Sequence, residues 1–188
     1  MASIIKVNDI QNTSGANIIN ESSNTITIGA SGDTVVLGSG ATASGFGGGK
    51  IGQVLSTSTT TRLVISTTNT SYTDLGLSQS ITCSSASSKV LIIVGIGCNI
   101  LGGNIEGYRA KIFRDSTDIE TFDQVFRVKT NDSAHRHRGT HTIQYLDTVG
   151  TTSQVTYKIQ VQRVDTNHDL EFQDGSQRSM ITLIEVLP

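Results

Sequence analysis

The chain has no tryptophan, two cysteines and one proline, its last residue, among 188 residues. Two cysteines supply neither a framework of several disulfides nor the repeated ligand spacing of a zinc domain. Charged residues make up only 16% of the sequence and the formal net charge is −2. This near-neutral balance argues against a nucleic-acid-binding protein and against a polybasic membrane-surface protein. No run approaches the roughly 18 consecutive apolar residues of a membrane-spanning helix, so membrane insertion is not expected.

Glycine, serine and threonine are abundant, which favours turns and β-structure over helices. They dominate residues 1–52, where TITIG is followed nine residues later by TVVLG, before the Gly-rich stretch GSGATASGFGGGK. Each of the two short runs has the composition of a β-strand closed by glycine, and the Gly-rich stretch that follows is typical of a linker.

Residues 1–52 contain too few large apolar side chains to order themselves. Fixing one residue costs roughly 1–2 kcal/mol of backbone entropy, and each buried Ile or Val returns at most about 1.5–3 kcal/mol. We therefore expect this segment to be an extended β stalk that becomes ordered against neighbouring chains, either identical copies or a larger particle. The remaining residues, 53–188, are expected to form a second domain.

Residues 53–188 carry the two-residue alternation of half-buried strands. VTYKIQVQ, from Val155, alternates without a break, whereas KVLIIVGIG, from Lys89, is apolar on both faces, as in a strand between two layers. Eight strands are predicted, at residues 77–83, 89–98, 108–114, 119–126, 140–147, 155–163, 169–173 and 179–187. The fold class is therefore all-β, and eight strands in about 120 residues fit an antiparallel β-sandwich of the jelly-roll type.

Three stretches of the sequence carry a resemblance to a known group of proteins. They are IIKVNDIQNTSGA (from Ile4), TITIGASGDTVVLGSGAT (from Thr25) and SYTDLGLSQSITCSSASSKVLIIVGIG (from Ser71). Together they resemble fibre and appendage proteins of tailed bacteriophages. The resemblance implies a homotrimer in the virion, assembled in the bacterial cytoplasm, with a jelly-roll head like the trimeric heads of tumour-necrosis-factor and C1q-like proteins. The short stalk departs from long-reaching tail fibres and fits a stubby appendage of tail or capsid equally well.

The resemblance also implies how the chain is anchored and what it contacts. It assigns docking on other virion proteins to the apolar residues of the N-terminal segment, Ile4, Ile5, Val7 and Ile10. The leading function is that of a tail fibre or appendage subunit used for host attachment. Two alternatives stay open: a capsid decoration protein that braces the particle, and a glycan-binding module unconnected with a virion.

A basic cluster around AHRHRGTH, from Ala134, is the candidate contact site for a receptor or partner. It comprises Arg127, Lys129, His135, Arg136, His137 and Arg138. Guanidinium groups bind phosphate and carboxylate well, so a host-surface glycan or an acidic protein is a suitable partner. Because the turn-like sequence KTNDS precedes the cluster, the simplest interpretation is a solvated loop tip.

A metal site is the alternative for the two histidines His135 and His137. In a strand they point the same way, and three copies on a threefold axis would present six imidazoles, enough for an octahedral transition-metal ion. The neighbouring arginines disfavour a cation, so no metal or cofactor is expected. Cys83 and Cys98 fall in apolar stretches and are expected to pack as small hydrophobic thiols. No nucleophile, base and orienting group can be singled out, so the protein is not expected to be an enzyme.

Overall fold

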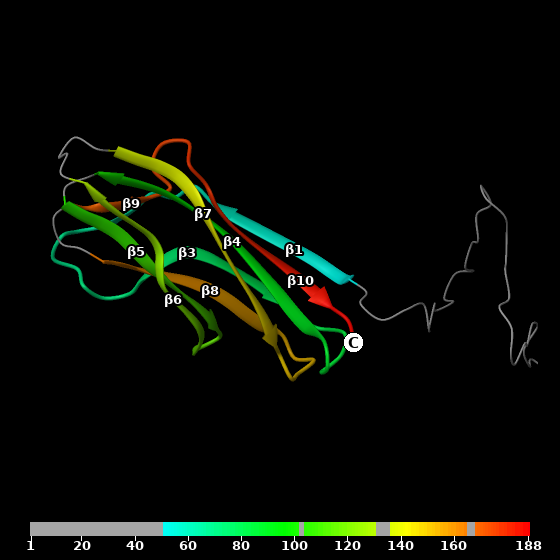
Figure 1. The fold of residues 1–188 in the computed structure, drawn as a ribbon. Helices are drawn as coiled ribbons and strands as arrows, with labels where there is room; N and C mark the ends of the chain where they lie inside the picture. Colours follow the sequence, from blue (N-terminus) through cyan, green and yellow to red (C-terminus); the bar gives the residue numbers. More distant parts are fainter. Residues whose placement is uncertain (1–50, 102–103, 131–135, 165–167) are drawn as a thin grey trace, which may run out of the picture. The chain divides into compact units, whose positions relative to one another are not determined.

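A computed structural model describes residues 51–101, 104–130, 136–164 and 168–188 (Figure 1). The chain separates into one unit of residues 1–46 and another of residues 47–188. The predicted stalk, with Ile4, Ile5, Val7 and Ile10, lies outside the described residues. Among the described residues there is no helix with the length and hydropathy that a bilayer span requires.

The described residues form ten β-strands joined by turns and loops, with no helix among them. Their bounds are β1 (Ile51–Thr59), β2 (Leu63–Ile65), β3 (Thr73–Ile81), β4 (Lys89–Leu101), β5 (Asn104–Arg114), β6 (Thr117–Thr130), β7 (Arg136–Thr148), β8 (Val155–Arg163), β9 (Leu170–Phe172) and β10 (Ser179–Val186). They form two antiparallel sheets that face one another, as Figure 1 shows. The prediction of an all-β, two-sheet architecture is thus confirmed.

The larger sheet, called sheet A, is organised around β4. One edge of β4 pairs with β7 along its whole length, and the other edge pairs first with β10 and then with the short β9. Strand β1 pairs with the outer edge of β10, and β2 pairs with β9. The C-terminal strand β10 therefore lies between the first described strand and β4.

The smaller sheet, called sheet B, has the strand order β3-β8-β5-β6. Across both sheets the long strands pair in nested order: β5 with β6, β4 with β7, β3 with β8, and β1 with β10. The chain thus behaves as one long antiparallel ribbon that is folded over on itself, which brings segments far apart in sequence into contact.

The core lies between the inner faces of the two sheets. Strand β8 shows why these residues form strands: Val155, Tyr157, Ile159 and Val161 are buried, and the polar residues between them are only half-buried. Strand β4 contributes six inward side chains, namely Val90, Ile92, Val94, Ile96, Cys98 and Ile100, all at most 1% exposed. Both cysteines are buried free thiols, as the apolar sequence around them predicts.

Candidate functional site

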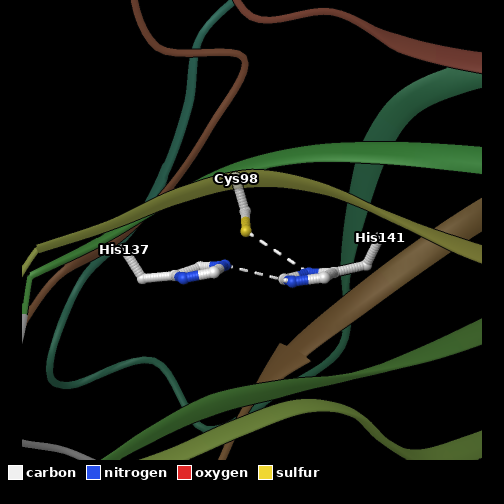
Figure 2. A group of neighbouring side chains, drawn as sticks. All are labelled: Cys98, His137 and His141. Atoms are coloured by element: carbon white, nitrogen blue, oxygen red, sulfur yellow. Dashed lines mark hydrogen bonds between the residues drawn. The ribbon is translucent and has the colours of Figure 1, made fainter.

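The polar side chains that come together on the inner face of sheet A belong to β4 and β7. Residues two apart in a strand share a face, so His137 and His141 both point inward, with Gly139 between them. The register pairs Cys98 of β4 with Gly139. Cys98 therefore also points toward the inner face, and Figure 2 shows its thiol between the two imidazoles.

The three side chains are within contact distance of one another. The Nε2 atoms of His137 and His141 are 3.2 Å apart, and Cys98 Sγ lies 3.5 Å from His141 Nδ1. The two rings are nearly coplanar, with 5° between their planes, and meet edge to edge (Figure 2). A Cβ atom at Gly139 would stand 3.2 Å from His137 Nε2, so a larger residue at this position would crowd the His137 ring.

Aromatic residues of sheet B complete the surroundings. Phe126 of β6 stacks on both imidazoles, with ring centroids 4.2 Å from that of His137 and 4.5 Å from that of His141. The hydroxyl of Tyr108 in β5 lies 2.9 Å from His141 Nδ1. The cluster of Cys98, His137, His141, Tyr108 and Phe126, here called the His–Cys cluster, therefore bridges the two sheets.

Burial sets the charge state of the cluster. It lowers the pKa of His141, and the charge of the neighbouring His137 lowers it further, so His141 is a neutral imidazole at pH 7. Burial also raises the pKa of the Cys98 thiol to about 12, against a smaller lowering by the hydrogen bond with Tyr108. The cluster thus holds a thiol and neutral imidazole, which are the side chains that ligate transition metals once the thiol loses its proton.

The predicted basic contact site is divided between the two sheets. Arg127 and Lys129 are exposed on β6, where they alternate with Phe126, so they lie on the outer face of sheet B. Arg136 and Arg138 are exposed on β7, where they alternate with His137, so they lie on the outer face of sheet A. The four cations therefore form two separate pairs, and His135 lies outside the described residues.

The pair on sheet A already has partners within the chain. Arg138 forms an ion pair of 2.6 Å with Asp174, and Arg136 Nε donates a 3.0 Å hydrogen bond to the side-chain oxygen of Asn99. Asp174 also lies 3.5 Å from Arg62. This intramolecular network reduces the net positive charge that Arg136 and Arg138 present to another molecule.

The structure places residues 136–141 in strand β7 and not in the loop tip that the sequence suggested. His137 is half-buried against Phe126, because pairing with β4 turns its side chain toward the core. Sequence reasoning missed the role of Cys98 and of His141 at this site. The available signal was the spacing His137-x-Gly139-x-His141, which puts two imidazoles on one face of a strand with no side chain between them.

The outer face of sheet A carries a row of large aliphatic side chains across four strands. The register aligns Leu146 of β7, Leu91 of β4, Ile184 of β10 and Val54 of β1. Val54 and Leu146 are 56% and 47% exposed, respectively, and we call these four residues the apolar row. The next two register positions carry no charged side chain; they hold Gln144, Ile93, Thr182 and Ser56, then Thr142, Gly95, Met180 and Ser58.

The outer face of sheet B differs in character because it is rich in cations. Its outward positions on β5, β6 and β8 include Arg109, Lys111, Arg127, Lys129 and Lys158. Lys111 pairs with Asp118, and Lys158 lies 5.3 Å above the ring of Phe113. The sandwich therefore has one outer face with an uncharged region around the apolar row and one outer face with five cationic side chains.

No protein-family model and no curated protein matches this sequence. Among solved structures, a chain in the structure of infectious bursal disease virus, Gx strain, is similar over 72% of this chain and 38% of its own length. The identity is 11% and the TM-score 0.40. This chain thus spans about two fifths of the length of that viral protein.

Proposed function

We propose that this protein is a non-enzymatic structural subunit of a bacteriophage virion, a homotrimeric fibre or appendage whose β-sandwich is the outward head. The observation that carries the proposal is the apolar row on sheet A. The resemblance to phage appendage proteins supplies the virion setting. The nested pairing of strands supports a jelly roll, the two-sheet fold that occurs in viral structural proteins.

The occupant that best fits the apolar row is a second copy of this chain. The row and the two register positions on its Met180 side are uncharged, so they need no partner of opposite charge; on the other side the register aligns Ile51 with Val186 and exposed Lys89. In a trimeric ring each copy meets one neighbour with one part of its surface and the other neighbour with a different part, so the row and the uncharged positions beside it can be covered together. Exposed apolar regions of this kind on a soluble domain mark association surfaces.

The expected gain from covering this face can be worked from the exposures. Ile51, Val54, Leu146 and Met180 are between 47% and 64% exposed. Full burial of one large apolar side chain returns about 1.5–3 kcal/mol. Completing the burial of four half-exposed side chains therefore returns roughly 3–6 kcal/mol per chain, and closed symmetry repeats this gain in every copy.

Packing through sheet A leaves sheet B facing outward, where its cations meet the host or another virion protein. Arg127 and Lys129 are then the contact residues of choice, since both are exposed. Arg136 and Arg138 are less suitable because they are engaged on the other face. An anionic glycan or an acidic protein surface is the matching partner.

The oligomer is tested by sedimentation of the full chain and of matched variants. We expect a trimer for the natural sequence, and monomers for Val54→Lys and Leu146→Lys, because each places a charge in the apolar row at an exposed position. Val64→Lys is the control. This residue is also an exposed aliphatic of sheet A, 39% exposed, but lies on β2, away from the row. A monomeric natural chain at micromolar concentration, or variants that remain trimeric, would overturn the proposed interface.

The place on the particle is tested by labelling intact virions with an antibody to the sandwich. A label confined to the tail, with cell binding lost in the Arg127→Ala, Lys129→Ala double variant and kept in Arg138→Ala, supports host attachment. A label across the capsid, with unchanged cell binding, assigns the chain to capsid decoration instead. Binding to sugars with no incorporation into particles would contradict a virion subunit.

A further inference from the structure

We propose that the His–Cys cluster is a binding site for a transition-metal ion of the zinc type, held within one chain by Cys98, His137 and His141. This site is independent of the oligomer interface, which uses the opposite face of sheet A. It also differs from the histidine pair expected on a threefold axis, because all three ligands come from β4 and β7 of one copy.

The spacing of the donor atoms suits a tetrahedral ion. Two nitrogens bound to zinc at 2.0–2.1 Å are separated by roughly 3.3 Å along a tetrahedral edge, and the two Nε2 atoms here are 3.2 Å apart. One donor atom from each of the three residues lies within 4.8 Å of the others. The thiol lies 3.5 Å from His141 Nδ1 and has to turn toward the two Nε2 atoms, from which zinc bonds of 2.0–2.3 Å would set it roughly 3.5 Å away.

The pairing of β4 with β7 builds this geometry into the backbone. Cys98 is directly opposite Gly139, and the two histidines flank that glycine at equal distances along β7. The ligand positions are therefore fixed by strand register and not by a loop. Since a Cβ at position 139 would press on His137 Nε2 at 3.2 Å, glycine at this position keeps the nitrogen aimed at the site.

The surrounding residues supply the outer shell that metal-binding histidines require. A ligating imidazole normally uses its second ring nitrogen in a hydrogen bond that fixes the tautomer. When His141 binds through Nε2, its Nδ1 carries the proton and donates to the Tyr108 hydroxyl oxygen, 2.9 Å away. Phe126 stacks on both rings and holds their planes.

Binding has a defined proton balance. The Cys98 thiol is protonated in the metal-free chain, so the ion displaces one proton to solvent as the sulfur–metal bond forms, while His141 supplies its neutral ring. A thiolate with two imidazoles favours Zn²⁺ over hard ions such as Mg²⁺ and Ca²⁺, which prefer oxygen ligands. Three protein ligands leave a fourth position for water or another small ligand.

The test uses the full chain, stripped with a chelator and kept reduced. Cobalt(II) is titrated first, because bonding to a thiolate gives a charge-transfer band in the near ultraviolet. We expect one Co²⁺ to bind per chain, and we expect the band to disappear when Zn²⁺ replaces Co²⁺. Zinc at a hundredfold excess over its dissociation constant should raise the melting temperature by roughly 5–10 °C. Magnesium should neither remove the cobalt band nor raise the melting temperature.

Variants assign the ligands. His137→Ala and Cys98→Ser should lose the band and the zinc-dependent rise in melting temperature. Tyr108→Phe should keep the band but bind roughly 10–100-fold more weakly, as expected for loss of an outer-shell partner. Cys83→Ser is the control for the thiol, since Cys83 is the other buried free cysteine.

His135→Ala separates this site from a threefold histidine site. It should leave binding unchanged. His137 is half-buried, so His137→Ala keeps the test valid even where Cys98→Ser impairs folding. Absence of a cobalt band in the natural chain, a band that survives His137→Ala, or one that disappears with His135→Ala or Cys83→Ser, would each overturn the proposal.

Discussion

Glu185 of β10 joins three parts of the sandwich and gives a sharp test of its energetics. The residue is 1% exposed. Its Oε1 accepts two hydrogen bonds of 2.7 Å from Ser84, one from the backbone N–H and one from the hydroxyl. Its Oε2 accepts a 2.9 Å hydrogen bond from the Gln53 amide. One carboxylate therefore ties β10 to β1 and to the connection between β3 and β4.

The hydrogen bonds set the size of the expected effect. Burial on its own raises the pKa of the Glu185 carboxyl, but the donors from Gln53 and Ser84 outweigh it and hold the pKa at about 2, below the ordinary 4.5. This difference corresponds to about 3 kcal/mol of stability. Because the folded pKa lies below the unfolded one, this contribution is present above about pH 5 and is lost as the pH falls from 4.5 toward 2.

The assay is urea unfolding of the natural chain and of Glu185→Gln at pH 7, 5 and 3. At pH 7 the variant should be less stable by up to about 3 kcal/mol. At pH 3 the natural chain has lost roughly three fifths of this contribution, so the gap between the two proteins should narrow. Glu120→Gln, which removes the same charge from β6, is the control. A gap that stays constant between pH 7 and pH 3 would refute the reasoning.

Two further substitutions test the packing of the sandwich. Gly107→Ala should destabilise the chain by about 2–3 kcal/mol, because its Cβ would stand 2.2 Å from the backbone oxygen of Phe126; Gly95→Ala, which meets only a side-chain methyl at 3.3 Å, should cost clearly less in the same urea titration. Tyr157→Phe should cost about 1–2 kcal/mol, because the phenol donates a 2.7 Å hydrogen bond to buried Asp147; an unchanged unfolding midpoint would show that this bond contributes nothing.

Much of the sandwich could be predicted from the sequence because its strands are locally patterned. The predicted strand 155–163 coincides with β8, and the predicted strand at 89–98 lies within β4. Both have strong signals, an unbroken alternation in one and apolar residues on both faces in the other. The strands β1 and β2 were missed. In β1 the inward positions include Thr57 and Thr59, and in β2 only three residues pair, so local hydrophobicity gives little signal.

The candidate site was harder to predict because it depends on strand register. The sequence drew attention to the histidines, but no local pattern places Cys98, some forty residues earlier, opposite Gly139. The same limit applies to the basic residues. Arg127 and Arg138 are close in the sequence, yet they belong to different sheets and face opposite ways. Pairing between distant segments determines both the assembly of the His–Cys cluster and the separation of the basic residues.

The position of β10 between β1 and β4 has a consequence for synthesis on the ribosome. Within the described residues, β1 finds its sheet partner only in β10, and β10 follows the other nine described strands in the sequence. In a nascent chain that ends after β9, strands β1 and β4 still lack β10, the strand that lies between them in the sheet. We therefore expect the sandwich to close after translation has passed Val186, and chaperones or sister chains to meet the protein before that moment with its hydrophobic interior open.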